Sequence, residues 1–381
     1  EYSSFFRVVI ARFCKQLPML TRHTDKVSVR NSEPARHPSF GTDRGRVDCD
    51  TRQVVRRHQS ETQPGAITKE NNLRIALIGQ SAFGKSVLEA LIEKGQDEIV
   101  GVFAPPTKEG RSPDPISDAA NELNIPIFEF KRLRDQEAID QFKSIDPELC
   151  VMAFVTDIVP MKMINFPSSG TIQYHPSLLP LHRGPSSINW PIINGETETG
   201  LTIFWPDDGL DTGPVLMQKK VTISPDATLG SVYFNKLYPL GVEAMIESVD
   251  LVRNGNAPKI IQDESKATYE SWCKASDVVI DWTADVGTVY NMIRGADPQP
   301  GANTTFNGTR LSLYDIASSS YGSDGREPGA IIEIGGGKIV VTANNGSVAI
   351  GRVRATGGKK IGSSQWAESV NLKVGDTFGG D

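Results

Sequence analysis

Apolar positions fall into short runs that alternate with amphipathic stretches from residue 73 onward. The run LRIALIG ends in glycine and is typical of a buried strand, and a helical pattern follows from Lys85 to Lys94. The same alternation predicts more strands at 98–104, 125–130 and 149–155, and more helices at 115–124 and 136–145. Strands that alternate with helices predict an α/β fold, a Rossmann-like and mostly parallel sheet with helices on both faces.

The pattern changes toward the C-terminus. The stretch AIIEIGGGKIVVTANNGSVAIGRVRA (330–355) holds three short β-rich runs separated by GGG and NNG. Glycine and asparagine accept the positive φ of tight hairpin turns. We therefore expect a small β-barrel-like domain of the OB type at 281–381. The catalytic domain is expected at 73–265, and the polar run QDESKATYESW leads into a connector that we place at 266–280.

Residues 1–72 differ from the rest. They are rich in Arg, Ser, Thr and Gln without a sustained apolar period, which predicts a mostly disordered leader. They carry 13 Lys and Arg against 8 Asp and Glu, a net of +5, whereas residues 73–381 carry 27 against 38, a net of −11. A mitochondrial transit peptide and a misassigned chain start both stay open for the leader. The acidic main body argues against a dominant nucleic-acid-binding surface.

The overall composition is that of a soluble protein, with 23% charged and 38% hydrophobic residues. No apolar run reaches 18 residues, so we expect no membrane span. The four cysteines form no CxxC-type motif, which favours a reducing compartment and predicts no metal site. We expect a cytoplasmic location, or a mitochondrial one if residues 1–72 are a transit peptide.

The segment GQSAFGKS (79–86) matches the phosphate-binding pattern GxxxxGK[ST] and lies between a strand and a helix. A P-loop ATPase is therefore a competing hypothesis. Such an enzyme also needs an acidic residue that ends a second apolar strand. The strand at 98–104 ends without one, and Asp157 lies past the expected position. The other interpretation is that Gly79 and Gly84 permit a tight turn and that Lys85 is exposed.

Candidate chemistry lies in two loops. Residues 73–381 hold only two histidines, both within TIQYHPSLLPLHRGPSSINW. His175 follows the apolar strand GTIQY, which places it at a strand's carboxyl end, where open α/β sheets bind ligands. The strand LTIFW leads into the loop FWPDDGLDTGP with three carboxylates. A structural histidine and a solvated acidic turn are the alternatives.

HPSLLP followed by GLDTGP resembles the formyltransferases that use 10-formyltetrahydrofolate. The family includes methionyl-tRNA formyltransferase and the hydrolase domain of 10-formyltetrahydrofolate dehydrogenase. The resemblance covers residues 73–381, including IRGADPQPGA (293–302). It is greatest to the hydrolase domain, which YHPSLLPLHRGPSSINW and IFWPDDGLDTGP match nearly residue for residue.

The resemblance implies a catalytic trio. The family's His and Asp correspond to His175 and Asp211, and its Asn corresponds to Gln173, which carries its amide one methylene further out. It also implies a set of substrate-binding residues: the pterin loop Asp207, Asp208, Gly209 and Leu210, the pocket residues Phe154 and Val155, the neighbours Ser177 and Leu178, and Arg183 for an acceptor or carboxylate. For Arg183, an ordinary surface ion pair is the alternative.

The implied reaction is hydrolysis of 10-formyltetrahydrofolate to tetrahydrofolate and formate. Water attacks the formyl carbon, and Asp211 orients His175 and, directly or through water, helps take the proton. His175 stabilises the oxyanion and helps protonate the leaving N10. Neither a metal nor an NADP-binding domain in this chain is expected. Methionyl-tRNA formyltransferase, with tRNA as partner of the basic run RVRATGGKK (352–360), and a folate carrier are the alternatives. The formyl acceptor and the oligomeric state stay open.

Overall fold

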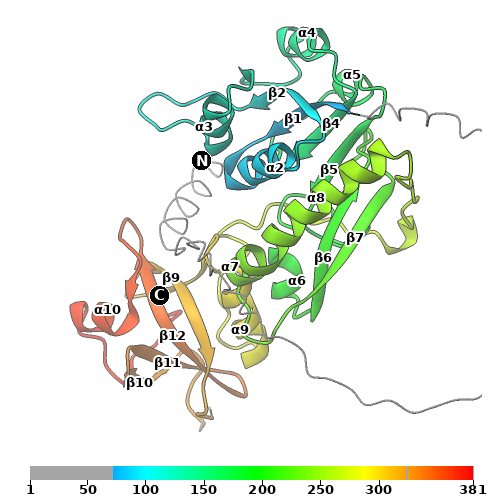
Figure 1. The fold of residues 1–381 in the computed structure, drawn as a ribbon. Coiled ribbons are helices and arrows are strands. Elements are labelled where there is room, and N and C mark those ends of the chain that lie inside the picture. Colours follow the sequence, from blue (N-terminus) through cyan, green and yellow to red (C-terminus); the bar gives the residue numbers. More distant parts are fainter. Residues whose placement is uncertain (1–71, 323–324, 381) are drawn as a thin grey trace, which may run out of the picture. The chain divides into compact units, whose positions relative to one another are not determined.

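A computed structural model describes residues 72–322 and 325–380 (Figure 1). The leader expected at 1–72 lies outside these residues except for its last position. The first part of the described chain alternates strands and helices in this order: β1 Arg74–Gly79, α2 Ser81–Lys94, β2 Glu98–Ala104, α3 Pro115–Glu122, β3 Ile127–Glu129, α4 Gln136–Ser144, β4 Leu149–Ala153, α5 Met161–Ile164, β5 Thr171–His175, α6 Asn189–Ile193, β6 Glu198–Phe204, β7 Val215–Thr222, α7 Leu229–Val232, a π-helical turn Tyr233–Leu237, α8 Tyr238–Arg253 and a 3₁₀ turn Glu264–Lys266.

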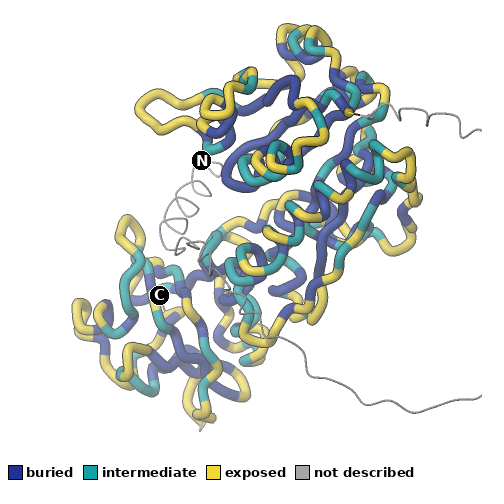
Figure 2. The backbone as a smooth tube through the Cα atoms, in the orientation of Figure 1, coloured by how far each residue is buried: buried dark blue, intermediate teal, exposed yellow. Residues whose placement is uncertain are grey.

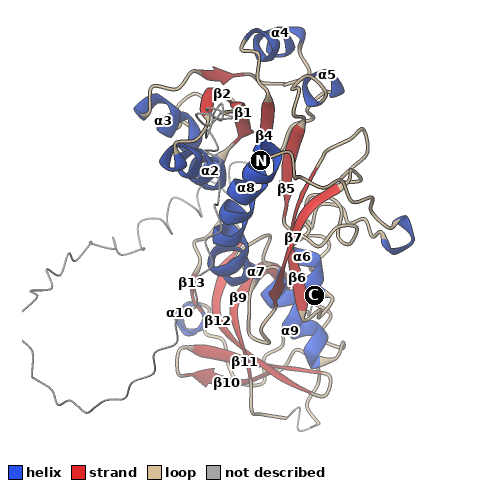
Figure 3. Cartoon of the chain, turned by 45° about the vertical axis from the view of Figure 1, so that its right-hand side comes forward, coloured by secondary structure: helices blue, strands red, loops and turns tan. Residues whose placement is uncertain are grey.

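The strands of this part form one seven-stranded sheet in the order β3-β2-β1-β4-β5-β6-β7 (Figure 3). The pairs from β3 to β5 are parallel, and β6 runs antiparallel to both β5 and β7. The strand order reverses direction between β1 and β4, which makes their carboxyl ends the switch point of the sheet. The predicted α/β fold with a mostly parallel sheet is confirmed.

The central strands are apolar along their whole length because both faces of the sheet are covered. On one face, Ile78 packs in a cluster with Phe142 of α4 and Met163 of α5. On the other face, Phe83 of α2 contacts Tyr174 of β5, and α2 lies beside α8. Figure 2 shows these strands as continuous buried segments. Polar side chains therefore reach open space only where the strands end.

The junction between β1 and α2 does not have the geometry of a P-loop. Helix α2 begins at Ser81, so its first turns occupy residues that a phosphate-binding loop would need. A Cβ at Gly79 would lie 2.7 Å from the carbonyl oxygen of Ala153, so this glycine permits close packing. Lys85 lies in the second turn, half-buried, and pairs with Glu89 at 3.5 Å, so the expected exposed position is only partly reached. Asp157 accepts a hydrogen bond of 2.7 Å from the Leu133 amide.

The second part of the described chain forms an antiparallel sheet in the order β10-β11-β12-β9-β8, with β13 paired to β12. Positive φ at Gly336, Gly337 and Asn345 confirms the two predicted hairpin turns. Closure of this sheet into an OB-type barrel stays a prediction. The elements of this part are α9 Val286–Gly295, β8 Ala302–Phe306, β9 Thr309–Ser318, β10 Ile331–Gly335, β11 Lys338–Ala343, β12 Gly346–Ala355, β13 Ile361–Gly362 and α10 Ser363–Ser369.

The core of this second part reaches back into the segment expected as a connector. Cys273, Val278 and Ile280 are buried together with residues of β8 to β12 and α10. Within residues 72–322 and 325–380, no helix combines the length and the apolar character needed to cross a bilayer.

A core substitution tests the described packing. Phe142→Ala removes a fully buried ring that lies 5.4 Å from Phe103 and 6.2 Å from Phe166, centroid to centroid. We expect the free energy of unfolding to fall by about 3–5 kcal/mol in urea denaturation. Val374→Ala, at a side chain that is 57% exposed, should change it by less than about 0.5 kcal/mol. If both substitutions lowered the free energy of unfolding equally, Phe142 would not belong to a packed core.

Candidate functional site

The central histidine is placed by strand β5. Tyr174 faces helices α2 and α8, because its ring lies 4.4 Å from Phe83 and a Cβ at Gly241 would come within 2.6 Å of it. Side chains alternate between the faces of a strand, so Gln173 and His175 share the opposite face. His175 is the last residue of β5 and is only 5% exposed. The sequence prediction of a histidine at a strand's carboxyl end is confirmed.

The His175 ring has two different neighbours. Nε2 lies 2.9 Å from the carbonyl oxygen of His182, and a carbonyl oxygen only accepts, so Nε2 carries a hydrogen. Nδ1 lies 3.7 Å from Oδ2 of Asp211, too far for a direct hydrogen bond. In the neutral ring, Nδ1 therefore holds the lone pair and faces the Asp211 carboxylate.

Asp211 is held in an unusual backbone conformation. It is 9% exposed and its φ is +57°, a left-handed value that is uncommon outside glycine. Its Oδ2 accepts a hydrogen bond of 2.8 Å from the Gly184 amide. Two residues on, a Cβ at Gly213 would lie 1.8 Å from the carbonyl oxygen of Trp205. The GLDTG segment thus has a backbone path that depends on glycine and on a charge-assisted hydrogen bond.

The loop before Asp211 is open. Asp208, Gly209 and Leu210 are exposed, with Leu210 at 57%. Asp207 accepts hydrogen bonds from the Gly209 amide at 3.1 Å and from the Thr212 hydroxyl at 2.6 Å, so its carboxylate shapes the loop. These exposed residues present backbone groups and one apolar side chain to a ligand.

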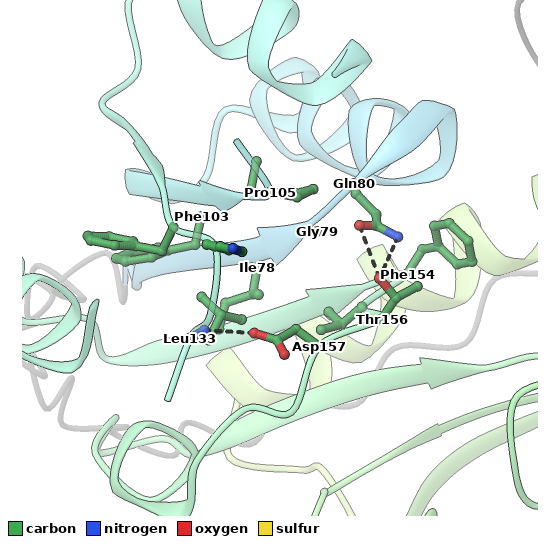
Figure 4. Close-up of a pocket in the computed structure, with 13 residues that line it drawn as sticks. Ile78, Gly79, Gln80, Phe103, Pro105, Leu133, Phe154, Thr156 and Asp157 are labelled. Atoms are coloured by element: carbon green, nitrogen blue, oxygen red, sulfur yellow. Dashed lines mark hydrogen bonds between the residues drawn. The ribbon is translucent and has the colours of Figure 1, made fainter. Parts of the chain in front are cut away.

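Phe154 and Val155 line a cavity of about 230 Å³ (Figure 4). Its walls come from the ends of β1, β2 and β4 and from the segment after β3, at the switch point of the sheet. Gln80 donates a hydrogen bond of 3.1 Å to Thr156 in its wall. Phe154 follows β4, whose Met152 lies opposite Gln173 of β5. The cavity therefore lies at the end of β4, and His175 lies at the end of the neighbouring strand β5.

Three other predicted residues are not open to a ligand in the same way. Ser177 is fully buried and donates to the carbonyl oxygen of Leu181 at 2.7 Å. Leu178 packs against Gly200 of β6, where a Cβ would lie 2.5 Å from its Cδ2. Arg183 is fully buried but forms an ion pair with the exposed Glu264, so the ion pair considered for it is present and only its surface position is wrong. Its guanidinium binds Gln262, Glu264 and Tyr269, and the hydrogen bonds with Glu264 raise its pKa.

Sequence reasoning missed the contribution of the segment after α8. Gln262 donates hydrogen bonds to the carbonyl oxygens of Asp211 and Gly213, at 2.8 and 2.7 Å. His182 is buried with both ring nitrogens against carboxylates, Glu270 at 2.9 Å and Glu196 at 3.1 Å. The only signal in the sequence was the polar character of the run QDESKATYESW (262–272), which was interpreted as leading into a connector. In the part of the chain that the structure describes, no cluster of three or more His, Cys, Asp or Glu side chains is arranged to hold a metal ion.

Both parts of the chain match models of one class of protein, the formyl transferases. The model "Formyl transferase" covers residues 73–249, and "Formyl transferase, C-terminal domain" covers residues 273–371. The chain belongs to the formyl transferase family.

Two curated relatives illustrate the range of this family. The human mitochondrial 10-formyltetrahydrofolate dehydrogenase is 37% identical over 325 residues, which are 81% of this chain and 35% of that protein. A methionyl-tRNA formyltransferase from Geobacter sulfurreducens is 35% identical over 311 residues, which are 81% of this chain and 97% of that protein. The chain thus spans about a third of the length of the dehydrogenases it matches.

Solved structures share the fold. HypX from Aquifex aeolicus, in complex with tetrahydrofolic acid, superposes with a TM-score of 0.60 at 17% identity and covers 80% of this chain and 48% of that one. An N-formyltransferase from Helicobacter canadensis, with folinic acid and dTDP-3-aminofucose, gives 0.54 at 16% identity and covers 76% of this chain and all of the other.

The glycine requirement next to Asp211 is testable. Gly213→Ala forces a methyl group against the backbone of Trp205, so the loop must shift. We expect a loss of about 1–3 kcal/mol in the free energy of unfolding, measured in urea. Gly362→Ala is the matched control, because its φ is −59° and nothing lies within 4 Å of the new methyl group. A Gly213→Ala variant as stable as this control would contradict the backbone path.

Proposed function

We propose that this protein binds 10-formyltetrahydrofolate and hydrolyses it to tetrahydrofolate and formate. The observation that carries the proposal is the buried His175 and Asp211 pair at the end of β5, with 3.7 Å between Nδ1 and Oδ2. The names of the relatives support a formyl-folate substrate, and the bound tetrahydrofolic acid in a protein of the same fold supports a folate site. The sequence around both residues supports a reaction like that of the hydrolase domain.

The first step is attack by water on the formyl carbon. As the new C–O bond forms, the carbonyl oxygen becomes an oxyanion and the water gives its proton to Nδ1 of His175. Because Nε2 already donates to the carbonyl of His182, the ring becomes an imidazolium beside the Asp211 carboxylate. General base assistance of this kind contributes ~10²–10⁴-fold in rate.

The second step breaks the bond between the formyl carbon and N10. The imidazolium returns its proton to N10, the oxyanion collapses, and formic acid leaves and ionises to formate. Gln173 lies on the same face of β5 as His175, two residues before it, so its amide is available to donate to the oxyanion. One well-placed donor of this kind is worth about 3–4 kcal/mol of transition-state stabilisation.

The folate is proposed to lie across the catalytic strand. The cavity lined by Phe154 and Val155 flanks β5 on the β4 side, and the exposed loop Asp207–Leu210 follows β6 on its other side. The pterin ring carries several donors and acceptors, which suits the exposed backbone of this loop. Hydrolysis uses none of the redox chemistry of a nicotinamide, and the proposed steps need no metal ion.

Formate release by purified protein without an acceptor tests this proposal. Wild-type protein should produce one formate and one tetrahydrofolate per 10-formyltetrahydrofolate consumed. His175→Ala and Asp211→Asn should each lower kcat by at least about 100-fold, since each removes one partner of the proton transfer. Thermal unfolding must show that both variants are folded. Full activity in either folded variant would remove that residue from the mechanism.

Methionyl-tRNA formyltransferase is the second candidate. It is favoured by the observation that this chain covers 97% of the length of the Geobacter enzyme. The run Arg352–Lys360 in and after β12 carries four basic residues, of which Arg352 pairs with Asp315 and Lys360 with Asp297, so the positive charge for a tRNA backbone would come mainly from Arg354 and Lys359.

Adding initiator Met-tRNA separates the two acceptors. If water is the acceptor, formate production should be unchanged within about twofold and no formyl-methionine should form. The same assay on His175→Ala serves as the blank, because neither reaction should survive it. Formyl-methionyl-tRNA formed faster than formate would replace the hydrolase with the transferase.

A further inference from the structure

Gln262 connects the two loops that hold the catalytic pair. It is 7% exposed and lies between α8 and the 3₁₀ turn Glu264–Lys266. Its Nε2 donates to the carbonyl oxygens of Asp211 at 2.8 Å and Gly213 at 2.7 Å. Its Oε1 accepts from Nε and Nη2 of Arg183 at 3.2 and 2.8 Å. All the hydrogen-bonding capacity of this amide is therefore used on the two loops.

We propose that Gln262 is a positioning residue that sets the Asp211 carboxylate relative to Nδ1 of His175. The inference rests on the proposed function, since it assigns Gln262 a part in the same proton transfer. Asp211 has a left-handed backbone, and rotation of the peptide that follows it would turn its carbonyl away from Nε2 of Gln262. Gln262 thus favours the one backbone conformation in which Oδ2 faces the histidine.

Arg183 closes the arrangement from the other side. It follows His182, whose carbonyl oxygen accepts from His175, and precedes Gly184, whose amide donates to Asp211. Gln262 holds the guanidinium of Arg183 with one end of its amide and the backbone around Asp211 with the other. Both partners of the histidine ring are therefore fixed by a closed path of hydrogen bonds that passes through one side chain.

The backbone after Gln262 reinforces this path. The Arg183 amide donates to the carbonyl oxygen of Thr268 at 3.0 Å, and the Glu270 amide donates to that of Arg183 at 3.0 Å. Gly184 has a φ of +108°, and a Cβ there would lie 2.2 Å from the carbonyl oxygen of Glu270. The segment 262–270 is therefore packed against the catalytic loop as an integral part of the site.

An isosteric substitution distinguishes positioning from general packing. Gln262→Glu keeps the shape and the acceptor oxygen for Arg183 but replaces the donating NH₂ with an oxygen that faces two carbonyls. We expect kcat for formate release to fall at least tenfold, with KM for 10-formyltetrahydrofolate within twofold of wild type. The pH profile of kcat should also shift, because the carboxylate beside His175 has moved.

Asn303→Asp is the matched control. Its Nδ2 donates to the carbonyl oxygens of Ala275 at 2.7 Å and Val278 at 3.0 Å, so a buried amide that bridges two carbonyls is removed away from Asp211 and from the loop after β5. This variant should keep wild-type kcat and the wild-type pH profile. If Gln262→Glu fails to fold, Gln262→Asn takes its place. Its amide retains the donors but is one methylene short, and the same loss of kcat is expected.

The outcomes separate this inference from the function beneath it. A folded Gln262 variant with wild-type kcat and pH profile overturns the positioning role, and so does a loss that appears only in KM or equally in Asn303→Asp. In both cases a strong effect of His175→Ala leaves the proposed function intact. If wild-type protein transfers formyl groups neither to water nor to Met-tRNA, the proposed function and this inference fail together.

Discussion

Coverage of both faces of the sheet is the constraint from which the arrangement of the site follows. Strands β1 and β4 are apolar on both sides, because helices pack on each face. Chemistry is therefore confined to strand ends and to the loops that leave them. His175 ends β5, the cavity lies where β1, β2 and β4 end, and Asp211 reaches the same histidine from the loop after β6. A loop without the sheet beside it would leave both side chains exposed to water, whereas here His175 and Asp211 are buried.

Local pattern was enough to predict the alternating elements from β1 to β4 and the places of His175 and Asp211 after apolar strands. Short apolar runs, the first of them bounded by glycine, marked β1, β2 and β4 within a few residues, since buried strands carry apolar residues on both faces. The glycine and asparagine runs marked the hairpins of the second sheet, because only such residues accept positive φ readily. His175 and Asp211 were singled out by residue type and by their place after apolar strands, and they do lie together.

The remainder depends on contacts that no local pattern encodes. β6 has the same apolar run as its neighbours but runs antiparallel, which is decided by pairing with β5 and β7. Helix α2 begins at Ser81, whose φ is +61°, so the segment that matches the P-loop pattern forms a helical turn. The Ser81 amide donates to Asp114, and Gly79 lies against the backbone of Ala153. The burial of Arg183 depends on Gln262, which lies 79 residues away. From charge and loop position alone, a ligand contact and a surface ion pair were the two interpretations of this arginine, and neither included its burial.

The hydrogen bonds of Gln262 place part of the site beyond the end of the seven-stranded sheet domain. A shortened chain that stopped at Arg253, where α8 ends, would retain the whole seven-stranded sheet together with His175 and Asp211. It would leave the carbonyl oxygens of Asp211 and Gly213 and the guanidinium of Arg183 without the amide that joins them. The strands of the sheet thus end before the residue that joins the two loops. A domain border drawn at the end of α8 would separate Gln262 from Asp211 and Arg183.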